Sequence, residues 1–390
     1  MRFSFTEQQD ALRCEIKDFF DREWNDEAKQ QAEAAGDSAT GHSSTLYKKL
    51  ADRGWLALNW PKEYGGKGWT PMEMSIFNEE CGYYRAPIEA FSLTSIVANA
   101  IIHAGNEEQK QQYLPKVATG DLLFCIGYSE PNAGSDLASL ETKAVQDGDD
   151  YIINGVKTFN SAGHHANYCW LATRTDSLAP KHKGITVFLV DMKSPGVTVR
   201  PLYNIADGRA QNELVFEDVR VPKENMVGEK NRGWYVIAKA LDIERISTSA
   251  CGNQRRSLEE LIEFCKETRS KGIPLSKDPL IRQKLVGLAT EIDVARMLAY
   301  RVIWLQSQGE IPDVPASMFK LYSSSLSQKI AHVGVEILGL RGIVNGASGW
   351  SYMNGRPEYA TRLTVPATVA GGTNEIQRTV IAQRGLGLPR

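Results

Sequence analysis

The sequence lacks several features that mark membrane, secreted or nucleic-acid-binding proteins. Its apolar runs all fall well short of the roughly 20 residues that cross a bilayer, so we expect no membrane span. Residues 1–10 contain no apolar stretch of the kind that a secretory signal needs, so no such signal is expected. Lys and Arg number 45 against 47 Asp and Glu, and the net charge of −2 argues against nucleic acid or an anionic membrane as the main partner.

The sequence also lacks paired cysteines. No CxxC pair occurs, which argues against a zinc site or a redox dithiol. Six cysteines in a chain of 390 residues without a secretory signal do not imply disulfides. We interpret them as buried, reduced thiols, which favours a cytoplasmic location. They are Cys14, Cys81, Cys125, Cys169, Cys251 and Cys265.

Motifs of several common active sites are absent as well. We find no GxGxxG, GxxxxGK[ST], HExxH or GxSxG pattern, so serine hydrolysis and nicotinamide binding by a Rossmann unit lose support. His164 and His165 are adjacent, and adjacent residues on a strand or helix do not converge on one metal. A loop or surface role is the better interpretation of this pair.

What is present is the composition of an ordinary globular protein, with 42% hydrophobic and 24% charged residues. Its length predicts two or three domains, at roughly 100–200 residues each. Apolar residues recur at helical spacing up to residue 121, and short strand-like runs follow between residues 122 and 232. There Asn154-Gly155 predicts a hairpin turn, and successive strands without helices predict an antiparallel barrel or sandwich. Long helical patterns from residue 233 predict a bundle of helices.

The segment Gly127–Asp136, with the sequence GYSEPNAGSD, is the most informative one. It leaves a predicted strand and enters a turn rich in Pro, Gly and Ser. Small residues let a backbone approach a ligand closely, and exposed N–H and hydroxyl groups can bind a flavin edge or a phosphate. On composition alone, a simple strand-to-loop turn remains the better interpretation.

The same segment resembles the TEPxAGSD motif of the acyl-CoA dehydrogenases. The similarity extends through Gly148–Ser161 (GDDYIINGVKTFNS), Val219–Pro222 (VRVP) and Gly371–Arg378 (GGTNEIQR). These blocks keep the order that they have in the family and spread over most of the chain. One block alone could match by chance, but the ordered set indicates membership of this family.

The resemblance implies an α+β multidomain fold. An N-terminal helical domain (residues 1–121) would precede a middle antiparallel β-barrel (residues 122–232) and a C-terminal four-helix bundle (residues 233–390). It also implies FAD, bound without a Rossmann fold between the barrel and the C-terminal helices. The implied reaction is α,β-dehydrogenation of an acyl-CoA thioester to a 2,3-enoyl-CoA, with the β-hydride passing to flavin N5. An electron-transfer flavoprotein would then accept the electrons, and the chain would assemble as a homotetramer or heterotetramer.

Carried over position by position, the resemblance assigns cofactor contacts to residues in five parts of the chain. Ser129 stands where the family usually has Thr, and Phe159, Asn160 and Ser161 stand where Trp-Ile-Thr is common. Phe159 would form an aromatic wall, and Ser161 would bond near flavin N5. The complete set of implied FAD contacts is Ile126, Tyr128, Ser129, Ser135, Phe159, Asn160, Ser161, Arg269, Glu336, Thr373 and Glu375.

The catalytic base is expected on a helix. Most of the family carries a Glu just before the C-terminal Gly-Thr, but Gly371 occupies that position here. The isovaleryl-CoA and long-chain branches place the base in a Leu-Asp-x-Glu-Arg context, which residues 241–245 resemble. Helical spacing gives Glu244 only apolar or small neighbours, so burial would raise its pKa toward that of a general base. Without the resemblance, a surface Glu beside Arg245 fits the pattern equally well.

Substrate contacts are implied for Ser135, Asp242, Arg245 and Gly372.

Two sequence elements of the family are altered in this chain. The Arg-x-x-Phe-Gly element is reduced to residues 268–272, where Lys271 replaces Phe and Arg269 is displaced by one position. Glu336 falls where the family has Gln near the FAD pyrophosphate, which is unfavourable unless Arg341 compensates.

These departures leave two alternatives open. One is a non-catalytic or half-site subunit of a heteromeric acyl-CoA dehydrogenase. The other is an acyl-CoA oxidase, which would keep the flavin but pass its electrons to oxygen.

Overall fold

The computed structural model describes residues 5–34, 41–244 and 249–389, with only the backbone for residues 241–244. The chain forms two compact units, and each consists of separate stretches of sequence. The helical unit contains Met1–Asp21, Thr70–Ala86 and Arg245–Arg390, and the sheet unit contains Arg22–Trp69 and Pro87–Glu244. The three-domain division by sequence order stays a prediction.

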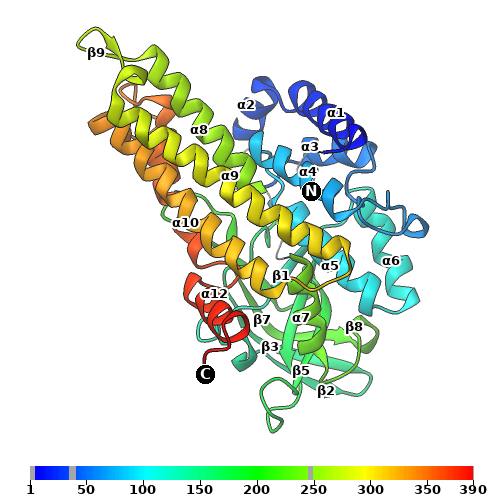
Figure 1. The fold of residues 1–390 in the computed structure, drawn as a ribbon. Helices are drawn as coiled ribbons and strands as arrows, with labels where there is room; N and C mark the ends of the chain where they lie inside the picture. Colours follow the sequence, from blue (N-terminus) through cyan, green and yellow to red (C-terminus); the bar gives the residue numbers. More distant parts are fainter. Residues whose placement is uncertain (1–4, 35–40, 245–248, 390) are drawn as a thin grey trace. The chain divides into compact units, whose positions relative to one another are not determined.

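The strands of the sheet unit form one open sheet (Figure 1). Its order is β6-β7-β3-β2-β4-β5-β8, and β1 pairs with β4 in parallel. Among the described residues no pairing joins β6 to β8, so the predicted closed barrel is wrong and the middle region is a mostly antiparallel sheet. The strands are β1 (Phe124–Gly127), β2 (Lys143–Asp147), β3 (Asp150–Lys157), β4 (Tyr168–Arg174), β5 (Ile185–Asp191), β6 (Val197–Leu202), β7 (Gln211–Pro222) and β8 (Met226–Val227).

The predicted hairpin turn is also misplaced. Asn154-Gly155 lies inside β3, where the register with β7 shifts between Ile153 and Gly155. A Cβ on Gly155 would lie only 2.6 Å from Thr142 Oγ1, so this bulge needs a glycine. The hairpin turn lies just before β3, where Gly148 has a φ of +64° between the paired residues Asp147 and Asp150. A dipeptide that suits a tight turn therefore serves here as a bulge.

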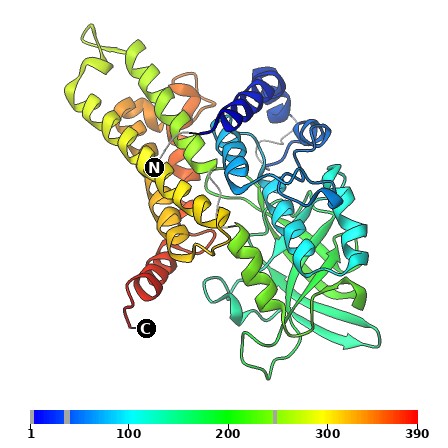
Figure 2. The ribbon, with the colours of Figure 1, turned by 45° about the vertical axis from the view of Figure 1, so that its right-hand side comes forward.

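Helices cover the sheet within the sheet unit. Figure 2 shows α5 (Glu89–Ala104) and α6 (Glu107–Ala118) against the strands. Together with β1, β4, β5 and α7 (Gly233–Glu244) they bury one hydrophobic core, which includes Trp60, Trp170 and Ile237. The Phe124 N–H donates to Thr94 Oγ1 at 3.0 Å and so fixes α5 to the start of β1. The unit also contains α2 (Asp26–Ala34) and α3 (Ser44–Asp52).

The helical unit is built around the long helices α8 (Ser249–Glu267), α9 (Pro279–Ser307) and α10 (Asp313–Leu338), which pack side by side (Figure 1). The helix predicted from residue 234 onward is described in two parts, α7 in the sheet unit and α8 here, on either side of residues 245–248, which lie outside the described residues. The four-helix bundle stays a prediction. The unit also contains α4 (Pro71–Tyr83), α11 (Arg356–Leu363), α12 (Asn374–Val380) and most of α1 (Glu7–Glu23).

A buried ion network ties these helices together. Glu79 and Glu80 on α4 are 1% and 0% exposed. Arg13 on α1 bridges both carboxylates at 3.0 Å, and Arg296 on α9 donates to Glu79 at 3.0 Å. Burial alone would raise the pKa of Glu79, but these guanidinium groups lower it overall. The network therefore links segments that are far apart in the sequence.

Across the described ranges, no helix is both long and apolar enough to cross a membrane.

Candidate functional site

The two segments predicted to line the flavin lie side by side in the sheet unit. Residues 126–129 leave the end of β1, and residues 158–161 leave the end of β3. The Thr158 N–H donates to the Ser129 carbonyl at 2.9 Å, and Asn160 Nδ2 donates to the Ile126 carbonyl at 2.7 Å. Residues that were predicted separately from two sequence blocks are thus brought together, although their role stays a prediction.

Tyr128 is held inside this arrangement. Its side chain is 9% exposed, and its hydroxyl accepts a hydrogen bond from Trp170 Nε1 at 2.9 Å. The ring belongs to the core of the sheet unit. Tyr128 is therefore placed to shape the site through its backbone more than through its ring.

Phe159 has the opposite character. Its side chain is 69% exposed, and its φ of +60° lies in the left-handed region, which costs an L-residue roughly 1–2 kcal/mol. Strained backbone and exposed aromatic rings both concentrate at ligand sites. The placement fits a ring that packs against the face of a planar ligand.

Asn160 carries an unused acceptor. The residue is 1% exposed, and within the described residues its Oδ1 atom is buried without a hydrogen-bond partner. Its backbone is fixed, because the Asn160 N–H donates to the Asn212 carbonyl at 2.9 Å and the Asn212 N–H donates back at 3.0 Å. A buried acceptor without a partner is costly unless a ligand supplies a donor. A ligand with an N–H or O–H group at this place would meet that need.

A buried ion pair that the sequence analysis missed fastens these segments. Lys157 is fully buried, and its Nζ atom donates to the Glu130 carboxylate at 2.7 Å and to the Tyr128 carbonyl at 3.0 Å. Burial lowers the pKa of Lys157 to about 8 despite the attraction of Glu130. Burial would raise the pKa of Glu130, but Lys157 and the N–H groups of Glu141 and Thr142 lower it overall. Lys157 is the last residue of a strand that also contains Asp150 and Asn154, so no clear signal in the sequence marked the pair.

Three imidazole rings lie close together at the turn of residues 161–165, with tilted planes. The ring centroids of His42 and His165 lie 4.8 Å apart, and those of His165 and His164 lie 4.2 Å apart. His164 and His165 lie in the turn over residues 161–165 and are half-buried, so the predicted loop position is confirmed. Burial, followed by the two neighbouring imidazoles, lowers the pKa of His165 to about 4. Among the described residues no cluster of His, Cys, Asp or Glu could hold a metal ion.

Ser135 is exposed and lies in the turn of residues 131–136. Its neighbour Asp136 forms an exposed ion pair with Lys181, with 2.8 Å between Oδ2 and Nζ. Its predicted contacts with the substrate or FAD stay predictions.

The other predicted cofactor residues lie in the helical unit. Arg269, in β9 (Arg269–Ser270), is exposed and donates to the Gly272 carbonyl at 2.9 Å. Glu336 on α10 pairs with Lys284 on α9, so Lys284, and not Arg341, neutralises it. Arg341 donates instead to the Tyr352 hydroxyl at 2.6 Å.

Thr373 and Glu375 open α12. Thr373 caps the helix, because its Oγ1 atom accepts the Ile376 N–H at 3.2 Å. Backbone N–H donation and then the Thr373 hydroxyl lower the pKa of Glu375. Gly371 and Gly372 precede them with φ values of +64° and +84°. A glutamate at Gly371 would therefore need a strained backbone.

The predicted base lies at the edge of what the structure describes. Glu244 is the last residue of α7, and the side chains of Asp242 and Glu244 lie outside the described residues, as does all of Arg245. Earlier on α7, Ile237 is 0% and Ala240 is 1% exposed. The described part of the predicted face is thus buried, and the role of Glu244 stays a prediction.

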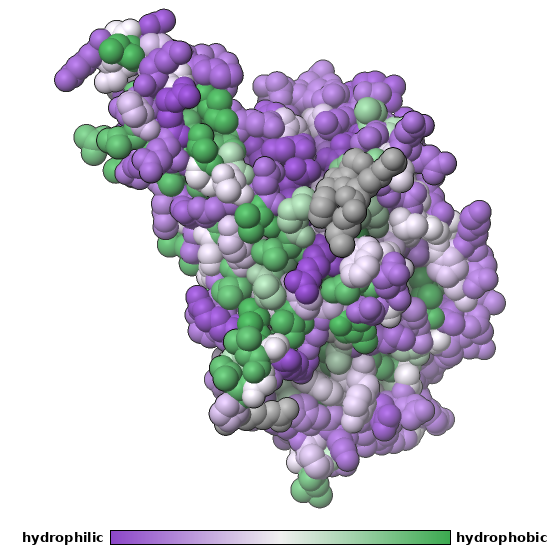
Figure 3. Space-filling view, in the orientation of Figure 1, coloured by the Kyte–Doolittle hydropathy of each residue, from purple (hydrophilic) through white to green (hydrophobic). Residues whose placement is uncertain are grey.

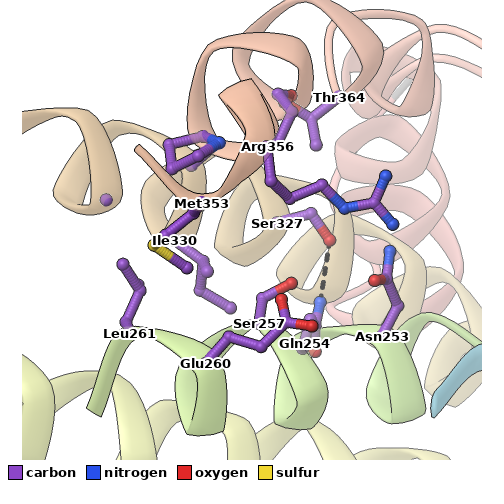
Figure 4. A pocket seen from close by; sticks show the side chains of 14 residues that line it. Asn253, Gln254, Ser257, Glu260, Leu261, Ser327, Ile330, Met353, Arg356 and Thr364 are labelled. Carbon is purple, nitrogen blue, oxygen red and sulfur yellow. Dashed lines mark hydrogen bonds between the residues drawn. The ribbon is translucent and has the colours of Figure 1, made fainter. Parts of the chain in front are cut away.

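A cavity of about 60 Å³ in the helical unit lies between α8, α10 and α11 (Figure 4). Gln254 lines it and donates through Nε2 to Ser327 Oγ at 2.9 Å, and Arg85 holds the Glu260 carboxylate at 2.7 Å. Ligand pockets usually measure roughly 300–1,000 Å³. This cavity has room for a few water molecules only, so it is no candidate for a flavin or thioester site.

Comparisons with known proteins match the whole chain. Family models of the acyl-CoA dehydrogenase N-terminal, middle and C-terminal domains match residues 6–121, 125–219 and 231–386. The chain is 36% identical to Acyl-CoA dehydrogenase FadE26 of Mycobacterium tuberculosis, with 100% of this chain and 99% of the relative covered. It is 31% identical to the mitochondrial short-chain specific acyl-CoA dehydrogenase of Rattus norvegicus, and the match covers 96% of this chain and 89% of the relative.

Solved structures agree with these relatives. The ChsE4-ChsE5 complex from Mycobacterium tuberculosis matches with a TM-score of 0.90 and 34% identity. The Tcur3481-Tcur3483 steroid ACAD matches with a TM-score of 0.91 and 31% identity. Both matches cover 100% of each chain. The chain therefore belongs to the acyl-CoA dehydrogenase family and is an oxidoreductase enzyme.

Proposed function

We propose that the protein is an FAD-dependent dehydrogenase that converts an acyl-CoA thioester to a 2,3-enoyl-CoA. Members of its family are FAD flavoproteins. The observation that carries the proposal is the meeting of residues 126–129 with residues 158–161, joined between Thr158 and Ser129 at 2.9 Å. Bound FAD would supply the acceptor for the substrate's β-hydride.

The described residues fit a flavin at this place. Phe159 offers an exposed ring, Asn160 a buried acceptor without a partner in the described chain, and Ser161 a hydroxyl. Ser129 would contribute at the end of the neighbouring segment. Lys157 and Glu130 keep this arrangement in place before any ligand binds, which reduces the ordering cost of binding.

Glu244 is proposed to remove the α-proton. A carboxylate must stand over the α-carbon in this reaction, and Gly371 has no side chain that could accept a proton. Glu244 ends a helix whose described face is buried, and burial favours a raised pKa for a carboxyl group. Asp242, Arg245, Ser135 and Gly372 are proposed to contact the thioester.

The test is flavin reduction by candidate thioesters in a stopped-flow instrument. The Glu244→Gln variant should bind FAD as the wild type does, because Gln keeps the size of Glu. It should lose about 10²–10⁴-fold in the rate of flavin bleaching, the range that a general base supplies. The matched control is Glu263→Gln on α8, because Glu263 is an exposed residue whose ion pair, in the described part of the chain, is with Lys266 at 3.0 Å. Undiminished bleaching by Glu244→Gln would refute this mechanism.

The substrate panel should include steroid-derived acyl-CoA thioesters. A structure similar to this chain with a TM-score of 0.91 is titled a steroid ACAD. Another similar structure, with a TM-score of 0.87 and 28% identity, is titled an electron transferring flavoprotein. An electron-transfer flavoprotein is therefore the proposed electron acceptor. Peroxide formation in air would instead favour an oxidase.

A heteromeric assembly is the second candidate, in which this chain is a half-site or non-catalytic subunit. The two structures reported above carry two protein names each, and one is titled a complex. The visible spectrum of the chain purified alone distinguishes the candidates. A yellow chain that acyl-CoA bleaches favours the homomeric enzyme, and a colourless chain that becomes yellow with a paralogous partner favours the heteromer.

A further inference from the structure

Asn212 connects the start of β7 to residues 159–162, the segment that is proposed to face the flavin. It is the second residue of β7 and is 0% exposed. The Asn160 N–H donates to the Asn212 carbonyl at 2.9 Å, and the Asn212 N–H donates back to the Asn160 carbonyl at 3.0 Å. Just before β7, the Ala210 carbonyl accepts the Ala162 N–H at 2.8 Å. The segment is therefore fixed at a residue that no sequence pattern indicated.

The backbone of this segment needs such support. Phe159 has a φ of +60° and Ala162 has a φ of +55°, so both lie in the left-handed region, which is unfavourable for residues with a side chain. Strained residues of this kind persist only where the surrounding structure holds them. Without its bonds to β7, we expect the segment to relax and the Phe159 ring and the Ser161 hydroxyl to change position.

The Asn212 side chain adds contacts beyond those of its backbone. Its Nδ2 atom donates to the Asn160 carbonyl at 3.0 Å, so this carbonyl accepts from both the backbone and the side chain of Asn212. The same amide group meets His164 Nδ1, through Nδ2 at 3.0 Å or through Oδ1 at 3.2 Å, according to the tautomer of the ring. A Cβ on Gly163 would lie 3.3 Å from Nδ2, so the turn packs closely on the amide.

We propose that Asn212 is a positioning residue whose side chain holds residues 159–162 in the conformation that receives the cofactor. It acts through the Asn160 carbonyl. With that carbonyl fixed, Asn160 keeps Nδ2 on the Ile126 carbonyl at 2.7 Å and keeps Oδ1, which has no partner in the described chain, in place for a ligand. The inference rests on the proposed flavin site, and it assigns to Asn212 the ordering of that site before FAD binds.

The test compares Asn212→Leu with the matched control Thr173→Val. Leu has nearly the size of Asn but lacks the amide group. Thr173 on β4 is also 0% exposed, and its Oγ1 atom donates to the Thr186 carbonyl at 3.1 Å. Each change thus removes a buried side-chain donor from a backbone carbonyl of the sheet unit. Urea unfolding should show a similar loss of stability for both variants.

Hydrogen exchange in the apoprotein measures the positioning without FAD. In the wild type, the amides of Asn160 and Ala162 should exchange slowly, because both are hydrogen-bonded to backbone carbonyls. Asn212→Leu should speed their exchange about fivefold relative to the Phe124 amide, the effect of one lost hydrogen bond. Thr173→Val should leave this ratio at its wild-type value.

FAD binding gives the second readout. Asn212→Leu should raise the dissociation constant of FAD about fivefold, again the effect of one hydrogen bond. It should also shift the visible absorption band of bound FAD, because residues 159–161 would surround the ring differently. Thr173→Val should keep the wild-type constant and spectrum. If Asn212→Leu does not fold, Asn212→Ala removes the same amide without adding apolar bulk, and the same results are expected of it.

Three results would overturn the inference. The first is fast exchange of the Asn160 and Ala162 amides in the wild type, and the second is unchanged exchange of these amides in the Asn212 variant. The third is an equal effect of the Asn212 and Thr173 changes on FAD binding and on the flavin spectrum, since a general loss of stability would then explain both. Locally faster exchange in a protein that binds no FAD would refute the proposed flavin site and leave the hold of Asn212 on the segment intact.

Discussion

At the scale of single residues, a few buried polar side chains hold the candidate site. Lys157 reaches from β3 to the segment that follows β1, where it meets both a carbonyl and a carboxylate. Neither charge of this pair is exposed enough to be stabilised by bulk water, since Lys157 is 0% and Glu130 is 8% exposed. Removal of one partner would therefore leave the other buried and uncompensated.

We expect Glu130→Gln to lower the free energy of unfolding by about 3–5 kcal/mol at pH 7. The pKa of Glu130 is lowered in the folded protein, so its contribution is present above the unfolded value of 4.5 and is lost as the pH falls through the folded value. The difference between the wild type and Glu130→Gln should thus shrink on acidification. Urea unfolding at several pH values measures it.

The control for this change is Glu141→Gln. Glu141 is exposed and adjacent to the same site, and its replacement should change the free energy of unfolding by no more than about 0.5 kcal/mol. A Glu130→Gln difference that stays constant between pH 7 and pH 3 would contradict the argument.

Single residues also show which parts of the candidate site could be predicted from the sequence and which could not. The segments 126–129 and 158–161 could be found because each keeps a recognisable order of residues. The Lys157–Glu130 ion pair was not predicted, because the two residues lie 27 positions apart in the sequence and only the fold brings them together. Glu336 was predicted to depend on Arg341, but the packing of α9 against α10 places Lys284 beside it instead.

At the scale of elements, close helix packing depends on glycines. A Cβ on Gly252 in α8 would lie 1.8 Å from the Glu79 carbonyl of α4, and one on Gly82 in α4 would lie 1.8 Å from the Ser249 carbonyl of α8. The two helices therefore touch backbone to backbone. This contact holds Glu79 and Glu80 where Arg13 can reach both.

We expect Gly252→Ala to lower the free energy of unfolding by at least about 1–3 kcal/mol, the usual cost of overpacking. Gly287 on α9 provides the matched control, since a Cβ there would meet nothing within 4 Å. Gly287→Ala should raise the free energy of unfolding by up to about 1 kcal/mol, because Ala favours the helix more than Gly does. Equal effects of the two changes in thermal or urea unfolding would refute the packing argument.

Periodicity predicted the elements better than it predicted their assembly. The helical and strand-like patterns of residues 122–232 and of the long helices correspond to described elements. Closure of the sheet could not be read from the sequence, since it depends on whether β6 and β8 pair, and alternation within a strand does not specify its neighbour. Asn154-Gly155 suits a turn and a bulge equally, so the choice depended on Thr142, which lies opposite it in the fold.

At the scale of the whole molecule, α9 presents an apolar surface within the helical unit. Its exposed apolar residues include Val286 (64% exposed), Val294 (42%) and Met297 (44%). They border a hollow of about 600 Å³ that is also lined by Ala289 and Leu298. Figure 3 shows apolar residues in green along the long helices. Such a surface is typical of a subunit contact, so we expect this face of α9 to be buried in an assembly.

We expect Val294→Lys to reduce the mass of the assembly, because a subunit contact would have to bury the new charge without a partner. Light scattering coupled to size-exclusion chromatography measures that mass, in the chain alone and with a paralogous partner. The control is Val145→Lys on β2, at a Val that is 62% exposed and lies in the sheet unit. A Val294→Lys protein with the wild-type mass would show that this face of α9 is not a subunit contact.

The discontinuous make-up of the helical unit has a consequence for biosynthesis. As the chain emerges from the ribosome, α1 and α4 appear early, but Arg296 and the rest of the final segment leave the exit tunnel much later. The sheet unit has all its residues once Glu244 has emerged, and units of this kind generally fold as they become complete. In the nascent chain, Glu79 and Glu80 are therefore synthesised well before Arg255 and Arg296, with which they pair in the folded protein. A stop codon before codon 255 would remove both Arg255 and Arg296, and of the guanidinium groups described as pairing with these acids it would leave Arg13.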